Sequence, residues 1–380
     1  MKPFIIVLYI STLIVLTVFS YGFIDPNLSL STNPILIRFI EPLTFLVYHK
    51  RPIATILFFI ILIILYIYYV LFLYNPKYGI SSMEKLRKVL LASATVLIFS
   101  YQALSYDLFN YITTAKVLFR YHENPYIVIP VEIPNDPNLL FTRAANKTAL
   151  YGPVWLAITA IPHYLGSGNI WLTIIAYKGM NAVVFLLFAY MVYHVTKSIT
   201  NVLFFALNPL VIMETLVSGH NDIFMMILAL AGLVLWKNKL VINNIIGWLL
   251  FIASWFIKGA TVVLLPVFIL RKLSLHYSLF IAYFLLLIVI LAIAPIREEL
   301  YPWYAVWIVS VMSLLPIDKH QFLTNLTIIF TFSLELRHLP YMWMGYYAGV
   351  GPGLRSLFIV IPVFVYLVVY GIIGVIKKSS

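Results

Sequence analysis

The sequence contains no cysteine, and this absence excludes several kinds of chemistry. Structural disulfides, thiolate metal ligands and cysteine nucleophiles all require the missing thiol. Charged residues are also scarce, since only 10% of the 380 residues are Asp, Glu, Lys or Arg, against roughly 25% in a soluble domain. A soluble globular fold is therefore not expected.

Two familiar sequence patterns are missing as well. No stretch shows the apolar–polar alternation that the strands of a membrane β-barrel require. No Gly-rich phosphate-binding loop and no dinucleotide-binding β–α–β unit is present either. Neither a β-barrel nor a conventional nucleotide-binding enzyme is expected.

Hydrophobic residues dominate what is present. They make up 63% of the chain, and the mean hydropathy is +1.00. Several apolar runs exceed the roughly 18 residues that mark a candidate transmembrane helix. The sequence therefore predicts an all-α, polytopic transmembrane protein in which residues 1–380 form one integral membrane domain. About twelve spans are expected, near residues 3–23, 52–74, 88–106, 170–195, 199–217, 222–236, 240–256, 258–270, 275–294, 303–316, 322–334 and 355–376.

The distribution of Lys and Arg predicts how these helices are oriented. We place the N-terminus in the cytoplasm and retain segment 1–23 as a first span, because it shows no signal-peptide cleavage site. Segment 149–165 must then be a re-entrant or interfacial helix, since a full crossing would put the later basic loops outside. The prediction is a multi-pass plasma-membrane protein with both termini in the cytoplasm.

The net charge of +12 at pH 7 suggests nucleic-acid binding at first sight. A nucleic-acid surface would need a basic stripe or a base-stacking aromatic platform, and the sequence shows neither. Loop charges that orient the helices explain the excess instead. Membrane lipids, not nucleic acid, are the expected partners.

Residues 107–169 are expected to form an extracytoplasmic loop that carries an amphipathic helix and the re-entrant helix. Apolar residues recur at helical spacing between Asp107 and Tyr121. Lys116 and Arg120 lie one turn apart and can point together. Asp107 itself ends the apolar run 89–106, and a carboxylate at a membrane boundary is costly unless it has a function.

A second polar segment, Ser218 to Asp222, lies between two apolar helices and follows Asn208-Pro209 and Glu214. The predicted topology places it on the same side of the membrane as Asp107. Its His and Asp side chains are suited to bind a metal or a hydroxylated ligand, or to adjust the position of a proton. A hydrated turn that caps the next helix is equally consistent with this pattern.

Cationic and aromatic side chains gather near the predicted outer boundary. A lipid phosphate would accept charge-assisted hydrogen bonds from such cations, although interfacial anchoring is the alternative for each of them. The cations are Lys258 and Arg297, and further along the chain Arg337, His338 and Arg355. The aromatic residues are either interfacial anchors or a surface on which a sugar stacks; they are Trp303, Tyr304 and Trp307.

Several short motifs occur in a defined order: Asp107 with Tyr111 and Ala115, Asn124-Pro125-Tyr126, Tyr151-Gly152-Pro153, Asn208-Pro209-Leu210 with Glu214, Gly219-His220-Asn221-Asp222, Lys258 with Pro266, and Pro302-Trp303-Tyr304 with Trp307. Together they resemble the GT-C superfamily of integral membrane glycosyltransferases, and within it the polyprenol-phosphate-mannose-dependent mannosyltransferases. The sequence departs from that family in two places. Two additional spans precede the Asp, and the usual Tyr-Pro-Pro is Tyr-Gly-Pro.

The resemblance implies a glycosyltransferase that moves a sugar, with mannose expected, from a polyprenyl-phosphate donor to an extracytoplasmic glycolipid or glycan acceptor. Asp107 would be the catalytic base or would orient the acceptor hydroxyl, and transfer would invert the anomeric configuration. No nucleotide site is needed, and no cofactor or metal ligand is assigned, although a divalent cation is compatible with Asp107, His220 and Asp222. The residues expected to bind the substrates are Tyr111, Lys116, Arg120, Asn124, Tyr126, Tyr151, Glu214, His220, Asn221, Asp222, Lys258, Arg297, Trp303 and Tyr304.

A membrane transporter or lipid flippase is the main alternative. Such a protein would be expected to show inverted repeats and charges buried within its spans, and Lys178 is the residue that best fits this alternative. No repeat is visible, and the unusual polar groups gather on one predicted face. A non-catalytic scaffold would give no reason for Asp107 and residues 218–222 to share that face.

Overall fold

The computed structural model describes residues 2–28, 30–75, 80–237, 240–296, 299–346 and 348–379, and these residues contain helices and no strand. The prediction of an all-α protein is confirmed. The α-helices are α1 Lys2–Ser20, α2 Pro34–His49, α3 Arg51–Tyr74, α4 Met83–Ile98, α5 Asp107–Phe119, α6 Pro153–Ile158, α7 Ala160–Gly166, α8 Ile170–Thr196, α9 Ile199–Ala206, α10 Pro209–Val211, α11 Asp222–Trp236, α12 Val241–Trp255, α13 Leu265–Ile269, α14 Leu275–Ile296, α15 Ala305–Met312, α16 Gln321–Leu336, α17 His338–Met344 and α18 Gly351–Ser379. Short helical turns of other types are η1 Tyr21–Phe23, η2 Pro130–Glu132, η3 Pro137–Phe141, η4 Ile212–Val217, η5 Gly259–Leu264 and η6 Pro302–Tyr304.

Fewer helices could cross a membrane unaided than the twelve apolar segments suggest. Among the described residues five helices are long and apolar enough, and a broken pair formed by α9 with α10 and η4 makes a sixth. The other segments hold shorter helices, because turns and prolines interrupt them. For example, α12 has 15 residues, whereas about 20 residues are needed to cross a bilayer.

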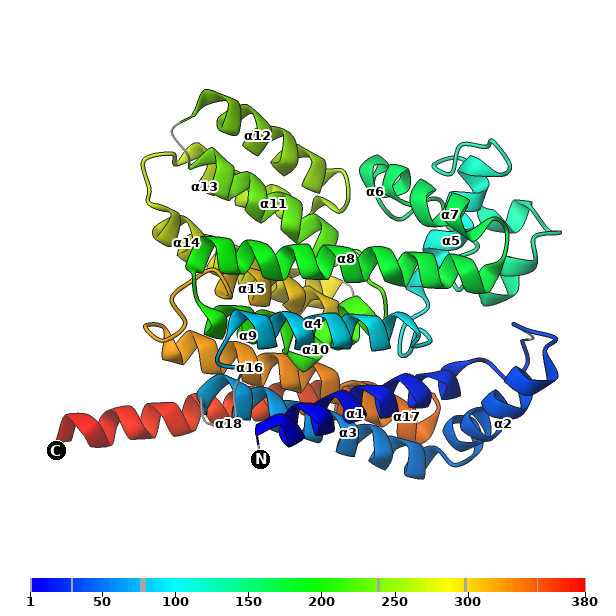
Figure 1. Cartoon of the computed structure of the whole chain (residues 1–380), viewed down its shortest axis with the longest axis horizontal. Coiled ribbons are helices and arrows are strands. Elements are labelled where there is room, and N and C mark those ends of the chain that lie inside the picture. Colours follow the sequence, from blue (N-terminus) through cyan, green and yellow to red (C-terminus); the bar gives the residue numbers. More distant parts are fainter. Residues whose placement is uncertain are drawn as a thin grey trace.

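The long helices run side by side, with α8 through the middle of the bundle (Figure 1). Helices α5, α6 and α7 gather at one end. Both chain termini point away from that end (Figure 1). The helices of the region between residues 107 and 169 therefore lie together at one end of the bundle.

The apolar segment 199–217 does not form one straight helix. Pro209 has no N–H, and the chain bends by 53° between Ala206 and Pro209. The Asn208 side chain accepts a hydrogen bond from the backbone N–H of Leu210 and so caps the second half. Tyr69 donates its hydroxyl hydrogen to the Phe204 carbonyl oxygen at 2.9 Å. This bond satisfies a backbone group that the bend leaves free, as the interior of a membrane protein demands.

Small residues allow two of the shorter helices to pack closely. A Cβ added to Gly232 of α11 would lie 2.7 Å from the Gly247 carbonyl oxygen of α12, and the reverse distance is the same. Helix interfaces in membranes depend on such small residues, because close backbone approach supplies the packing energy. The α11–α12 pair thus forms a unit beside α14 and η5.

The two predicted helices of the 107–169 region are present, with one difference. The first, α5, ends two residues before the predicted boundary. The difference is that α5 packs into the protein, with most of its side chains buried, whereas a helix lying on the surface was predicted. Its Lys116 ammonium reaches the Asp136 carboxylate at 2.6 Å. Residues 149–165 hold α6 and α7, which have 6 and 7 residues. Each is too short to cross a bilayer.

Candidate functional site

A cavity of about 1510 Å³ opens where α5 begins. Its walls come from segments far apart in the sequence: the start of α5, the turn before α6, the residues around Lys258, the face of α14, η6 and the junction of α16 with α17. Small-molecule pockets have volumes of roughly 300–1,000 Å³. The cavity is therefore large enough for two substrates at once.

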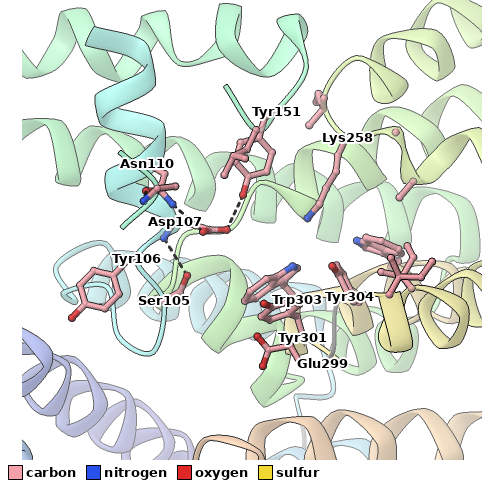
Figure 2. A pocket seen from close by; sticks show the side chains of 18 of the residues that line it. Ser105, Tyr106, Asp107, Asn110, Tyr151, Lys258, Glu299, Tyr301, Trp303 and Tyr304 are labelled. Carbon is pink, nitrogen blue, oxygen red and sulfur yellow. Dashed lines mark hydrogen bonds between the residues drawn. The ribbon is translucent and has the colours of Figure 1, made fainter. Parts of the chain in front are cut away.

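Asp107 presents its carboxylate to this cavity (Figure 2). Tyr151 donates a hydrogen bond to Oδ2 at 2.8 Å, and Asn110 donates one to Oδ1 at 3.4 Å. The side chain is 22% exposed, so the oxygens remain open to a ligand. Burial alone would raise the pKa of Asp107, but His220, Tyr151 and the charge of Lys258 outweigh it and lower the pKa. The carboxylate is therefore ionised at neutral pH.

His220 lies behind Asp107 and links it to a second carboxylate. Its Nδ1 is 3.4 Å from Asp107 Oδ2, and its Nε2 is 3.1 Å from Glu214 Oε2. Burial would lower the pKa of His220, but the two carboxylates outweigh it and raise the pKa to about 9. An imidazolium held between two carboxylates fixes the position of Asp107 and keeps it ionised.

The local backbone explains how His220 reaches this place. The chain leaves η4, a π-helical turn that contains Glu214, and Gly219 then adopts φ +79°, a left-handed conformation that favours glycine. The His220 N–H donates to the Glu214 carbonyl oxygen at 2.9 Å. This turn directs the imidazole back toward α5. Such π-turns are frequent at functional sites.

Asp222 and Lys258 form a second charged pair. The Lys258 ammonium donates to both Asp222 oxygens, at 2.9 and 3.1 Å, and the Trp307 indole N–H donates to Oδ1 at 2.6 Å. Asp222 is 1% exposed, whereas Lys258 is 22% exposed and lines the cavity. The buried Asp therefore holds the ammonium at the cavity wall, where it remains available to an anion.

The motif Tyr151-Gly152-Pro153 is attached directly to the segment that carries Lys258. The Gly152 N–H donates to the Ile257 carbonyl oxygen and the Val154 N–H to the Phe256 carbonyl oxygen, both at 3.0 Å. A Cβ at position 152 would lie 2.2 Å from the Phe256 carbonyl oxygen. Glycine is therefore required for this close approach. The contact fixes the distance between Tyr151, which binds Asp107, and Lys258.

Aromatic rings form the wall opposite Asp107 (Figure 2). Trp303 lies between two rings, with centroid distances of 4.2 Å to His220 and 4.3 Å to Tyr301. Tyr304 and Trp307 contact the Lys258 ammonium at 5.6 and 5.8 Å from their ring centroids. Stacked aromatic faces beside a carboxylate and a cation suit a sugar phosphate, since rings pack on sugars and the cation binds phosphate.

Basic side chains define the far side of the cavity. Arg337 donates to Glu299 at 2.6 Å, and Arg355 makes a second ion pair with the same carboxylate. All three residues line the cavity. The site thus combines an open carboxylate, an accessible ammonium and an aromatic wall. This arrangement can orient a hydroxyl nucleophile, bind an anionic leaving group and hold a sugar between them.

Residues 8–273 match the family described as alpha-(1->6)-mannopyranosyltransferase, N-terminal domain. The match covers well over half of the chain. The chain belongs to this mannosyltransferase family. Comparisons with curated proteins and with solved structures gave no match.

Family membership confirms the resemblance to GT-C mannosyltransferases that the sequence motifs suggest. The protein is thus a membrane glycosyltransferase of a mannose-transferring family. The matched range includes Asp107, Tyr151, the 208–222 segment and Lys258. The aromatic residues after position 300 lie beyond it, but the fold brings them to the same cavity.

The mannosyltransferase cavity contains some of the residues that the sequence suggests for substrate binding. Asp107, Tyr151, Lys258, Trp303 and Tyr304 line it directly. Three more predicted residues contact the lining residues or their partners: His220 contacts Asp107, Glu214 contacts His220, and Asp222 pairs with Lys258. Because these residues come from five separate segments, only the fold brings them together.

Other predicted residues lie elsewhere. Lys116 and Arg120 line a separate cavity of about 280 Å³ that shares no residue with the main one. Tyr111 packs behind Tyr151 with a ring distance of 4.9 Å, and Asn221 is fully buried. Neither residue lines the main cavity, and Tyr111 supports it through its contact with Tyr151.

The remaining predicted residues have local roles or lie outside the described residues. Asn124 accepts a hydrogen bond from the Tyr126 N–H at 3.0 Å. The Tyr126 hydroxyl donates to the Tyr151 carbonyl oxygen at 2.9 Å, so these two residues brace the loop. Arg297 lies outside the residues that the structure describes.

Arg337, His338 and Arg355 are named from the sequence as cations suited to a phosphate, but neither they nor Glu299 and Glu335 are among the residues predicted to bind substrate. Glu299, Arg337, His338 and Arg355 line the cavity, and Glu335 lies close to His338. The signal was a polar run, Glu335 to His338, directly after the apolar segment 322–334. The turn between α16 and α17 directs Arg337 and His338 of this run toward the cavity, and the hydrophobic pattern of a single helix does not predict where such a turn lies.

Asp107, His220 and Asp222, which the sequence leaves compatible with a divalent cation, do not form a single cluster of possible ligands among the described residues. Lys258 and Trp307 already occupy the Asp222 carboxylate, and His220 lies between Asp107 and Glu214. Lys178, the residue that best fits a transporter, donates to the carbonyl oxygens of Ser100 and Val217, both at 2.8 Å. It therefore connects α4 to the broken helix and has a structural explanation.

Proposed function

We propose that the protein transfers mannose from a polyprenyl-phosphate carrier to a hydroxyl of a lipid- or glycan-linked acceptor, with inversion at the anomeric carbon. The observation that supports this most strongly is the position of two groups in one cavity. The Asp107 carboxylate and the Lys258 ammonium both line it, together with an aromatic wall. These are the groups that an alcohol nucleophile and a phosphate leaving group require.

In the proposed reaction the acceptor oxygen attacks the anomeric carbon while the bond from that carbon to the phosphate oxygen breaks. The acceptor hydroxyl hydrogen passes to Asp107, and the electron pair of the broken bond stays on the phosphate. Lys258 stabilises the phosphate charge as it develops. Because no covalent sugar–enzyme bond forms, the new linkage lies on the opposite face of the sugar ring.

The lipid tail of the donor has a natural location beside α14. Val289, Ile293 and Ile296 line the cavity on this helix. Ile288 and Leu291 of the same helix are 61% and 55% exposed on the outside of the bundle. An apolar wall that leads from the cavity to a lipid-facing surface suits an isoprenoid chain whose phosphate stays near Lys258.

We place this site on the extracytoplasmic side of the plasma membrane and both termini in the cytoplasm. The Lys and Arg distribution favours this orientation. The termini point away from α5, α6 and α7 (Figure 1). The fold is therefore compatible with a site on one side of the membrane and both termini on the other.

A donor-dependence assay tests the proposed function. The full chain in lipid nanodiscs receives an alkyl mannoside acceptor and one radiolabelled donor, either polyprenyl-phosphate mannose or a nucleotide-linked mannose. We expect label in the mannoside only with the lipid donor, because the cavity meets an apolar helix face and the sequence has no nucleotide-binding loop. Transfer from the nucleotide donor without any lipid carrier would contradict the proposal.

The pH dependence of transfer reports on the contact between His220 and Asp107. In the wild type, His220 helps to lower the pKa of Asp107, so the carboxylate stays ionised into acid. In His220→Gln burial dominates, the pKa of Asp107 rises, and the base is protonated at higher pH. The acid limb of the pH–rate profile should therefore move to higher pH. An unchanged limb would remove His220 from this role.

A further inference from the structure

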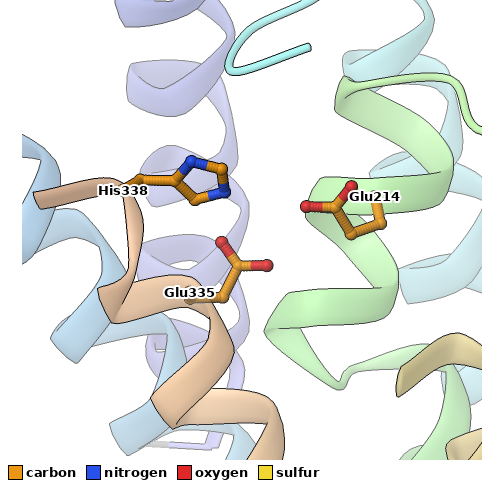
Figure 3. A group of neighbouring side chains, drawn as sticks. All are labelled: Glu214, Glu335 and His338. Carbon is orange, nitrogen blue, oxygen red and sulfur yellow. The ribbon is translucent and has the colours of Figure 1, made fainter. Parts of the chain in front are cut away.

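Three buried side chains with metal-binding chemistry meet beside the main cavity, which one of them, His338, also lines. Figure 3 shows the three together. Glu214 comes from the π-turn η4, Glu335 from the last turn of α16 and His338 from the first turn of α17. One ligand atom of each lies within 4.8 Å of the others. None of the three was recognised as a metal ligand in the sequence.

Two members of this cluster have side-chain atoms without a hydrogen-bond partner among the described residues. Glu335 is 0% exposed, and neither of its carboxylate oxygens is bonded. His338 is 7% exposed and its Nε2 is unbonded as well. Figure 3 shows the imidazole ring and the two carboxylates directed at one another. Unsatisfied buried polar groups are costly, and a native protein usually gives each of them a partner.

The charges around the cluster do not balance. Glu214 has the His220 imidazole at 3.1 Å, but Glu335 has no ion-pair partner among the described residues. The adjacent Arg337 directs its Nη2 to Glu299 at 2.6 Å. A buried carboxylate without a counter-charge is strongly unfavourable. A bound cation would supply the missing charge.

We propose that Glu214, Glu335 and His338 bind one first-row divalent cation, with Zn²⁺ and Mn²⁺ the best matches. Zn²⁺ combines imidazole nitrogen with carboxylate oxygen, and Mn²⁺ is suited to carboxylates. Three protein ligands leave at least one position for water. Ligands of one cation at about 2.1 Å lie roughly 3.5 Å apart in tetrahedral geometry. The carboxylates need only small side-chain rotations to close around the ion.

A cation can reach this position from the main cavity. His338 belongs to the cluster and also lines that cavity. The ion would join the π-turn of the broken helix to the α16–α17 junction. Neither Asp107 nor Lys258 is a ligand, so the cation stabilises the scaffold beside the site, and the inference does not depend on the proposed sugar transfer.

Metal counting and thermal unfolding on the full chain in nanodiscs test the site. The protein is stripped with a chelator, washed, and titrated with Zn²⁺ or Mn²⁺. We expect about one retained cation per chain and a higher unfolding temperature, because ligands of the native state stabilise it. Glu335→Gln and His338→Gln should lose both effects. His122→Gln and Glu123→Gln make the same two substitutions at exposed positions and should keep both.

Two results would overturn the site. The first is a wild-type protein whose unfolding temperature does not change on stripping and refilling, as expected if the two glutamates merely share a proton. The second is a cation retained equally in Glu335→Gln, which would place it elsewhere on a chain with 8 histidines. If both variants fail to fold, the wild-type titration alone decides the question.

Discussion

Asp107→Asn should lose transfer by about 10²–10⁴-fold, the usual contribution of a positioned general base. The amide has nearly the shape of the carboxylate and can still accept the Tyr151 hydrogen bond, so the cavity should keep its form. What disappears is the negative charge and the ability to take the acceptor proton. The measurement is single-turnover transfer from polyprenyl-phosphate mannose to an alkyl mannoside.

Glu123→Gln provides the matched control for this experiment. Glu123 is an exposed carboxylate in the region after α5 and does not line the cavity. It should keep wild-type turnover, and both variants should unfold at similar temperatures. Near-normal turnover in Asp107→Asn would exclude this carboxylate as the base, and the proposed reaction would then need another proton acceptor.

Lys258→Met should lower turnover by about 10²–10³-fold, the usual cost of removing one group that stabilises developing charge. The variant also leaves Asp222 buried, with Trp307 as the one side-chain donor that remains among the described residues. Its stability should therefore fall, because a buried charge without its partner is strongly unfavourable. Turnover and the unfolding temperature are both measured, since either effect could reduce the amount of product.

A double variant separates the two roles of Lys258. Lys258→Met combined with Asp222→Asn removes both charges, so the unfolding temperature should recover while turnover stays low. Recovered turnover would mean that Lys258 acts only by neutralising Asp222. Lys88→Met is the control, because Lys88 forms an exposed i,i+4 pair with Glu84, and such a pair contributes little.

Much of the site was predictable because its residues stand out against an apolar background. Asp107 ends a hydrophobic run, residues 218–222 interrupt two apolar helices, and Lys258 interrupts another. Charged groups are expensive in membranes, so each exception suggests a function. Lys116 shows the limit of this reasoning. It is equally unusual in a helix, but its partner is Asp136, and the pair has a structural role.

Composition and hydropathy alone determined that this is an all-helical membrane protein, and the order of its motifs indicated the family. These properties are local, since each depends on residues close together in the chain. Only the tertiary structure decided which polar groups share a cavity. It joined Tyr151 to the segment of Lys258 through the backbone of Gly152, and it brought Glu335 and His338 against Glu214. Such contacts depend on how bent and broken helices pack, which one-dimensional periodicity does not specify.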